Sequence, residues 1–245
     1  MDADQCPPDE ASLKLVVNDV ELVTIQCSPD GFDDLGVGFL YTNGVIGSFG
    51  EIGAIRFSGD ESALFVGLNK AEFPMPNRLI ITSGFGGGPV FSAEPPEGRV
   101  ESGFNMAPDQ MCKLMSAMKK RAVQYQKSGG IHAAALCSGD DIVYMAEDVG
   151  RQNSMDKVIG YCLKSGILFD NKAMLTTGRI SFEMVMKTMK AGIPVLASLS
   201  APTDKSVKQA DRCGIAVAGY VTDDGFIAYT HDHRFADDLQ NAVSD

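Results

Sequence analysis

One short polar stretch, residues 147–157, holds more charged and hydrogen-bonding groups than a simple turn requires. It reads Glu-Asp-Val-Gly-Arg-Gln-Asn-Ser-Met-Asp-Lys and lies between an apolar run and an amphipathic helical pattern. The junction of a strand with the helix that follows it is where open α/β folds bind ligands. We therefore predict that Arg151 and Lys157 are free to bind an anion near the helix start. A structural ion pair between Asp148 and Arg151 is an equally good interpretation.

The same stretch predicts how its helix begins. Asn153 is a residue type that caps helices, and Asp156 follows at the third helical position, so the two could form a capping box. The helix itself is expected over residues 154–164.

A glycine-rich loop, residues 82–88, reads Thr-Ser-Gly-Phe-Gly-Gly-Gly and follows a short predicted strand. Its backbone amides could converge on an anion, because glycine has no side chain in the way. The loop is not a P-loop, since no Lys-Ser or Lys-Thr pair follows it. A flexible hinge explains the glycines equally well.

Two more polar loops, residues 176–179 and 200–203, lie between predicted strands and helices. Arg179 stands before a helix and is a candidate for ligand contact, whereas Thr203 has the type of a helix N-cap. If the strands run parallel, all four polar loops gather at one edge of the sheet.

Some polar residues have plain structural interpretations. Glu183 and Lys187 are one helical turn apart and are predicted to form a surface ion pair. His132 follows a pair of glycines at the start of a predicted strand, and either a structural or a functional role fits it.

Hydrophobic periodicity predicts the elements that position these loops. Strands are predicted at residues 13–17, 21–27, 54–57, 63–68, 79–81, 131–137, 142–146, 173–175, 195–199, 216–221 and 226–229. Helices are predicted at residues 32–41, from 108 to the glycines at 129–130, and at 154–164, 180–190 and 204–212. The regular alternation predicts an α/β domain over residues 105–245, preceded by a smaller α+β part over residues 1–104.

The composition excludes several classes of function. The chain has 245 residues and a formal net charge of -11, which argues against non-specific nucleic-acid binding. No apolar run is long enough to span a membrane, and residues 1–10 lack the features of a signal peptide, so a cytoplasmic location is expected. The six cysteines include no Cys-x-x-Cys pair and the three histidines are no credible ligand set, so no metal site is predicted.

Five segments together resemble the formate dehydrogenase accessory sulfurtransferase family (FdhD/NarQ). They span most of the chain in the family's order, and one of them reads Ser-Gly-Gly-Ile-His-Ala-Ala-Ala-Leu. The segments are residues 36–46, 128–136, 147–160, 177–183 and 191–203. The resemblance implies a cytidine-deaminase-like α/β fold, in which a mixed sheet is flanked by helices, and a tendency to form homodimers.

The resemblance also implies a function. Members of the family bind the molybdenum cofactor as molybdenum bis(molybdopterin guanine dinucleotide). They pass it sulfur, received as a persulfide from a cysteine desulfurase, so that formate dehydrogenase becomes active. The residues that are expected at the cofactor are Ser83, Gly84, Gly86, Gly87, His132, Asp148, Arg151, Asn153, Lys157, Gly178, Arg179, Tyr220, Val221, Thr222, Asp223, Asp224 and Gly225.

The chain departs from the family pattern in three places. Phe85 stands where the family has its persulfide cysteine, Gln152 where a histidine is usual, and Asp223-Asp224 where a basic residue is common. A phenylalanine cannot hold a persulfide, because sulfur transfer needs a thiolate. Cys27 could substitute only if the N-terminal part folded over the glycine-rich loop.

Three hypotheses follow. The chain is either a maturation factor that binds the cofactor and transfers sulfur to it, or a non-catalytic cofactor-binding or chaperone homologue that has lost the transfer. A deaminase-like hydrolase is a third hypothesis, suggested by the fold alone, and it requires a zinc site for which no close cysteine pair exists.

Overall fold

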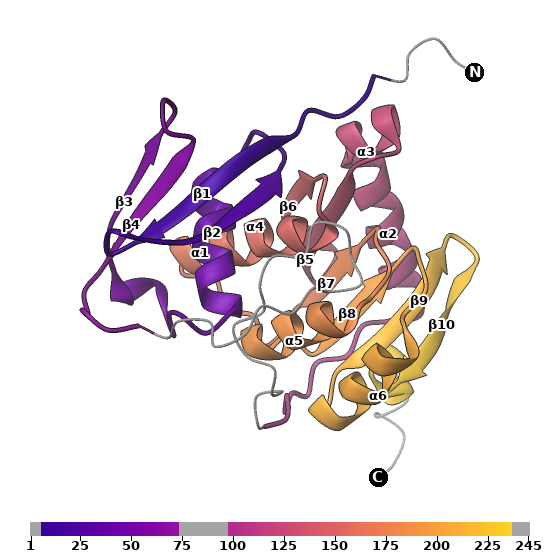
Figure 1. Cartoon of the computed structure of the whole chain (residues 1–245). Helices are drawn as coiled ribbons and strands as arrows, with labels where there is room; N and C mark the ends of the chain where they lie inside the picture. Colours follow the sequence, from indigo (N-terminus) through magenta and orange to yellow (C-terminus); the bar gives the residue numbers. More distant parts are fainter. Residues whose placement is uncertain (1–5, 74–97, 237–245) are drawn as a thin grey trace.

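The computed structural model describes residues 6–73 and 98–236, which form two sheets with helices packed between and around them (Figure 1). The N-terminal sheet has four strands in the order β2-β1-β4-β3. Strands β1 and β4 are parallel, and each pairs with an antiparallel neighbour at its other side. The elements of this part are β1 (Ala11–Val17), β2 (Val20–Cys27), α1 (Phe32–Thr42), the short helix η1 (Phe49–Glu51), β3 (Ile52–Ser58) and β4 (Ala63–Leu68).

The larger sheet has six strands in the order β10-β9-β8-β7-β5-β6. Strands β7, β8 and β9 are parallel, while β5 is antiparallel to both of its neighbours and β10 is antiparallel to β9. Its strands are β5 (His132–Ser138), β6 (Asp141–Asp148), β7 (Ala173–Thr176), β8 (Val195–Ser198), β9 (Ala216–Thr222) and β10 (Gly225–Thr230). The helices of this part are α2 (Pro108–Arg121), α3 (Val123–Ser128), α4 (Arg151–Lys164), α5 (Phe182–Ala191), α6 (Asp204–Cys213) and the short η2 (Asp232–Phe235).

Helices cover both faces of the six-stranded sheet, as its buried strands require. Alternate residues of β5 show this, because Ala134 and Leu136 pack with α4 and α5, whereas Ala135 and Cys137 pack with α2. Strands β7 and β8 are buried at every position. The expectation of a mixed α/β fold flanked by helices is confirmed.

Helix α1 joins the two parts, because it lies between the four-stranded sheet and α4 (Figure 1). Two glycines let α1 and α4 approach until their backbones touch. A Cβ atom on Gly38 would lie 1.8 Å from the carbonyl oxygen of Asp156, and one on Gly160 would lie 1.9 Å from that of Asp34. No larger residue fits at either position unless the helices move apart.

The predicted elements agree with the structure except in detail. The turn predicted at Asn18 and Asp19 is present, and both residues have positive φ, as a two-residue hairpin turn needs. The single helix predicted from residue 108 is wrong in one respect, since it is interrupted at Ala122, where ψ is 77°. The strand predicted at residues 79–81 lies outside the described residues. The division at residues 104 and 105 stays a prediction.

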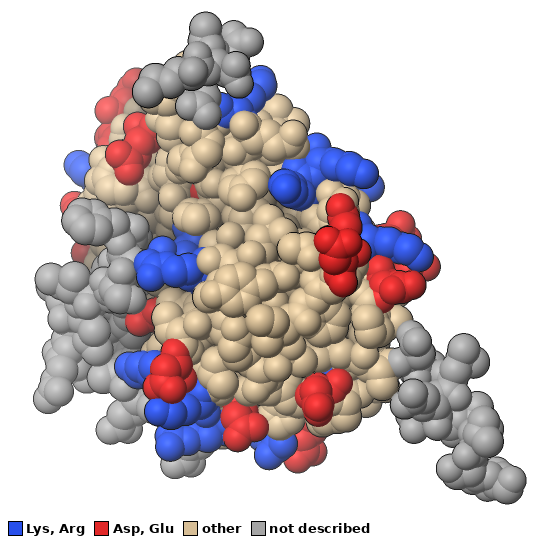
Figure 2. All heavy atoms as spheres, turned by 90° about the vertical axis from the view of Figure 1, so that its right-hand side faces the viewer, with Lys and Arg blue, Asp and Glu red and all other residues tan. Residues whose placement is uncertain are grey.

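Charged side chains are unevenly distributed on the side of β9 and β10. Figure 2 shows this side, where lysine, arginine, aspartate and glutamate lie around the margin of a broad uncharged area. Strand β10 carries no charged residue, and Ile227 in it is 50% exposed. In the part of the chain that the structure describes, no helix is long and apolar enough to cross a membrane.

The close crossing of α1 and α4 makes a prediction about stability. Replacing Gly38 or Gly160 by alanine should lower the free energy of unfolding by about 3 kcal/mol or more, because the new methyl group meets backbone that cannot move aside. Without this contact, alanine would stabilise a helix by up to about 1 kcal/mol relative to glycine.

Urea denaturation followed by circular dichroism measures this effect. Gly103→Ala is a suitable control, because a Cβ atom at Gly103 has no neighbour within 4 Å. A Gly38→Ala variant as stable as the wild type would show that the helices do not cross this closely.

Candidate functional site

Three of the four predicted polar loops meet at one edge of the six-stranded sheet. Strand β5 is antiparallel to both β6 and β7. Strands β6 and β7 therefore run in the same direction and end at the same edge of the sheet. His132 at the start of β5 pairs with Asp148, and Ala134 pairs with Thr176. Strand β8 runs parallel to β7 and brings the loop after Ser198 to the same place. The fourth loop, with Ser83, Gly84, Phe85, Gly86 and Gly87, lies outside the described residues.

Asp148 is fully buried at the end of β6, and hydrogen bonds hold both of its carboxylate oxygens. Oδ1 accepts from the backbone N–H of Gly150 and from the amide of Asn153, each at 2.8 Å. Oδ2 accepts from the backbone N–H of Ser28 at 3.0 Å and lies 2.8 Å from Nζ of Lys157. These contacts connect the turn after β2 to the start of α4. Because both oxygens already have partners, we assign Asp148 the role of holding this junction together.

The side chain of Lys157 is 2% exposed and lies inside this junction. Its Nζ lies 2.6 Å from Asp30 and 3.2 Å from the carbonyl oxygen of Glu147, in addition to its contact with Asp148. Burial works to lower the pKa of Lys157, but the charges and hydrogen bonds of Asp148 and Asp30 outweigh it and raise that pKa. The prediction that Lys157 is free to meet an anion is wrong, as is the predicted ion pair of Asp148 with Arg151.

The predicted capping box is also wrong. Helix α4 begins at Arg151 with Gly150 as its N-cap, so Asn153 is already inside the first turn. Its amide donates to the carbonyl oxygen of Gln26 at 2.8 Å as well as to Asp148. A tertiary contact has therefore replaced the local cap.

Asp156 points away from the helix start, into the contact between three helices. It accepts from Thr42 of α1 at 2.8 Å and from Lys187 of α5 at 2.7 Å. The predicted surface pair of Glu183 with Lys187 is therefore wrong, since Lys187 is buried and bound to Asp156. Burial raises the pKa of Asp156, and Lys187 opposes that rise.

The groups left at the sheet edge are cationic. Gly178 lies against Arg151 and His132, since a Cβ atom on it would be 2.8 Å from Cβ of Arg151 and 3.2 Å from Nδ1 of His132. Arg179 is exposed in the same loop. Burial first, and then the charge of Arg179, lowers the pKa of Arg151, while the charge of Glu183 works to raise it. Two like charges thus stand near each other with one acid nearby, and an anion would reduce the repulsion between them.

Four buried donor atoms have no hydrogen-bond partner within the described part of the chain. One is Nε of Arg234 in η2, and the other three are Nε of Arg151 and Nε2 of Gln152 at the start of α4, and Oγ of Ser181 before α5. Leaving such an atom unpaired costs about 1–3 kcal/mol. A ligand rich in acceptor oxygens, such as a phosphate ester, suits these donors and the arginines beside them. The residues present therefore suit phosphate oxygens in general, and those of a dinucleotide are one case.

The predicted segment from Tyr220 to Gly225 is only partly at this edge. The backbone N–H of Tyr220 donates to the carbonyl oxygen of Ser200 at 3.3 Å, which places it beside the loop after β8. Asp223, by contrast, lines a hollow with Cys112 and Lys113 of α2. Ligand contact by this segment stays a prediction.

The described cysteines differ sharply in accessibility. Cys6 is exposed and Cys112 is half-buried, whereas Cys27, Cys137, Cys162 and Cys213 are buried. Burial, reinforced by the charge of Asp148, raises the pKa of Cys27 to about 12. A thiol with such a pKa holds almost no thiolate at neutral pH, so Cys27 cannot replace the sulfur-carrying cysteine. The described residues contain no group of His, Cys, Asp and Glu that could hold a metal ion.

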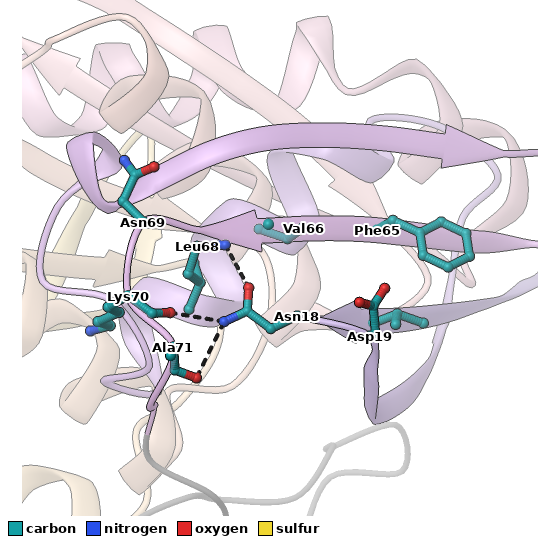
Figure 3. A pocket seen from close by; sticks show the side chains of 10 residues that line it. Asn18, Asp19, Phe65, Val66, Leu68, Asn69, Lys70 and Ala71 are labelled. Carbon is teal, nitrogen blue, oxygen red and sulfur yellow. Dashed lines mark hydrogen bonds between the residues drawn. The ribbon is translucent and has the colours of Figure 1, made fainter.

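A concave feature lies on the four-stranded sheet (Figure 3). It is a hollow of about 540 Å³ lined by Val16, Phe65 and the loop after β4. The side chain of Asn18 shapes it by accepting from the backbone N–H of Leu68 and donating to the carbonyl oxygen of Lys70, each at 2.8 Å. Asn18 and Ser28 lie at opposite ends of β2, roughly 25 Å apart.

Sequence reasoning missed the N-terminal residues that hold the site. Gln26, Ser28 and Asp30 contact the start of α4 from more than 120 positions away in the chain. No local sequence pattern predicts such contacts. Ser181 was also missed, although its place directly before a helix was a usable signal.

The fold and the site define a mixed α/β protein with a cationic binding edge beside a buried ionic junction. A family model described as the FdhD/NarQ family matches residues 8–236, and this chain therefore belongs to that family. The resemblance seen in the sequence is confirmed.

Relatives and a solved structure agree with this assignment. The sulfur carrier protein FdhD of Bacillus licheniformis is 35% identical over 233 residues, which cover 92% of this chain and 88% of that protein. The sulfur carrier protein FdhD of Bacillus subtilis is 33% identical over 236 residues, with the same coverage. A crystal structure of a formate dehydrogenase accessory protein from Desulfotalea psychrophila superposes with a TM-score of 0.76 at 21% identity, and covers 95% of this chain and 91% of that one. This last likeness shows the shared fold. The narrower expectation of a cytidine-deaminase-like sheet stays a prediction.

The buried junction makes a prediction about stability. Replacing Lys157 by methionine should lower the free energy of unfolding by about 3–5 kcal/mol, because it leaves Asp148 charged and buried without its cation. The stabilisation from Lys157 is present below its ordinary pKa and is lost as the pH rises through its raised folded-state value, in strongly alkaline solution.

Chemical denaturation at neutral and alkaline pH measures both effects. Lys208→Met is the matched control, since Lys208 forms an exposed ion pair with Asp204 and should change stability by less than about 1 kcal/mol. Equal losses in the two variants would refute the role given to Lys157.

Proposed function

We propose that this chain is a formate dehydrogenase maturation protein that binds the molybdenum bis(molybdopterin guanine dinucleotide) cofactor at the sheet edge formed by β5, β6 and β7. One observation carries the proposal, namely the unpaired buried donors of Arg151 and Gln152 beside a second arginine, Arg179. The FdhD/NarQ relatives support it, because the curated ones are named sulfur carrier proteins.

Each residue at this edge has a distinct task in the proposed function. Arg151 and Arg179 supply the charge that attracts a diphosphate, and the lack of a side chain at Gly178 keeps the space between them open. Asp148, Asn153 and Lys157 hold α4 so that Arg151 stays at the edge. When bound, the molybdenum centre of the cofactor supplies the atom that receives sulfur.

Sulfur transfer needs a thiol on this chain that can accept a persulfide sulfur from a desulfurase. Its thiolate would attack the outer sulfur of the desulfurase persulfide and release the desulfurase cysteine as a thiolate. Phe85 cannot do this, and Cys6 is the exposed cysteine of the described part. The alternative is a homologue that binds the cofactor or docks on formate dehydrogenase without transferring sulfur.

Guanosine diphosphate, as a fragment of the cofactor, tests the binding site. Calorimetry should show binding to the wild type, and Arg151→Gln and Arg179→Gln should each weaken it at least about tenfold, as expected for a lost hydrogen bond to a charged group. Arg212→Gln is the control, since Arg212 is exposed near the end of α6. No heat at millimolar nucleotide would refute the proposed site.

A persulfide assay separates the two versions of the function. The protein is incubated with a cysteine desulfurase and sulfur-labelled cysteine, and the label is then followed on the wild type and on Cys6→Ser. Label that is stable on the wild type and lost on reduction shows a sulfur carrier, and its loss in Cys6→Ser assigns the carrier. An unlabelled wild type supports the binding protein that transfers no sulfur.

We further propose that the protein forms a homodimer through the uncharged area around β10 (Figure 2). Copies of a chain with a net charge of -11 repel one another, and this repulsion is weakest at close range where an area carries no charged side chains. Sedimentation should give a dimer for the wild type and a monomer for Ile227→Lys, which places a charge on that area. A monomeric wild type would refute this.

A further inference from the structure

Thr177, in the loop after β7, contacts the start of β5 through its backbone N–H and its hydroxyl. Its N–H donates to the carbonyl oxygen of Ala133, and its Oγ1 accepts from the N–H of the same residue, each at 3.0 Å. The same Oγ1 lies 3.4 Å from Nδ1 of His132. Thr177 is 7% exposed and β-branched, so its hydroxyl has little freedom to turn elsewhere.

The hydroxyl has one proton and two acceptor lone pairs. One lone pair accepts from the N–H of Ala133, and the proton is available to the ring nitrogen of His132. A neutral imidazole has one acceptor nitrogen and one N–H. If Nδ1 is the acceptor, the proton of the ring is on Nε2.

Burial and the nearby charges together favour the neutral form of the His132 ring. The charged groups that act on it are Arg151 of α4, Arg179 of the loop before α5 and Asp148 of β6. Burial first, and then Arg151, lowers the pKa of His132. Asp148 acts in the other direction, but its oxygens are already bound to Lys157 and to three N–H groups.

We propose that Thr177 is a positioning residue that fixes His132 as the Nε2–H tautomer, so that His132 meets an anionic ligand as a neutral hydrogen-bond donor. The encounter with a ligand rests on the proposed function, whereas the tautomer is a property of the free protein. His132 then contributes a directional hydrogen bond to the site, whereas the two arginines contribute its positive charge.

The tautomer is measured by nitrogen NMR of the full chain labelled on its three histidines, with His132→Gln used for assignment. Near neutral pH, the wild type and Thr177→Ser should both show Nε2–H at His132. Thr177→Val, which keeps the shape but removes the hydroxyl, should show a mixture of tautomers and a higher pKa for His132, because a bond to the neutral ring is lost. Thr188→Val is the control, since Thr188 is buried and its hydroxyl donates within α5.

An Nδ1–H or charged ring in the wild type would overturn the proposal, and so would an unchanged ring in Thr177→Val. That variant also leaves the N–H of Ala133 without its acceptor, and its fold is checked by circular dichroism. If it does not fold, the wild type and Thr177→Ser still decide, because Nδ1–H in either contradicts the proposal and Nε2–H in both supports it.

Binding of guanosine diphosphate, measured by calorimetry, tests the role in the site. The affinity should fall about three- to tenfold in Thr177→Val, the range expected for one neutral hydrogen bond, and should be kept in Thr177→Ser. An unchanged affinity in Thr177→Val would overturn the positioning role. No binding by the wild type would defeat the proposed function instead, and the tautomer result would stand by itself.

Discussion

The buried carboxylate of Asp148 is the constraint on which the binding edge depends. An ionised carboxylate without exposure to water is costly unless every oxygen is satisfied. Here the N–H groups of Ser28 and Gly150, the amide of Asn153 and the ammonium of Lys157 satisfy it. These donors come from the turn after β2, from the turn after β6 and from α4, so the charge cannot be neutralised unless the two parts of the chain are assembled.

The packing of α1 makes that assembly possible. Gly38 and Gly160 bring the backbones of α1 and α4 into contact, and the second buried ion pair, between Asp156 and Lys187, adds α5 to the same group. The turn before α1 is thereby held over the start of α4, where Ser28 and Asp30 contact it. Dense packing of this kind transmits small displacements, so a change at the crossing of the two helices would reach Arg151.

The binding edge differs from this junction in having unpaired donors. The carboxylate of Asp148 is already paired with Lys157. Nε of Arg151 is buried and has no partner in the described residues. A buried polar atom without a partner requires an explanation, and a bound ion or ligand is one such explanation. In the proposed function, an anion would bind here by giving the unpaired donors the acceptors that folding leaves out, and a neutral His132 would add a directional hydrogen bond.

The sequence by itself determined most of the elements and the family, and it predicted which polar loops share one edge of the sheet. The alternation of strands and helices is local, and the polar loops after β6, β7 and β8 had to meet once those strands shared a direction. The tertiary structure alone decided which polar residues are free. Arg151 and Lys157 looked equivalent in the chain, yet Lys157 is bound to two carboxylates while Arg151 keeps an unpaired donor. The physical reason is that ion pairing depends on distances between side chains from far-apart segments, such as Asp30 and Lys157, and no local pattern of residue types records those distances.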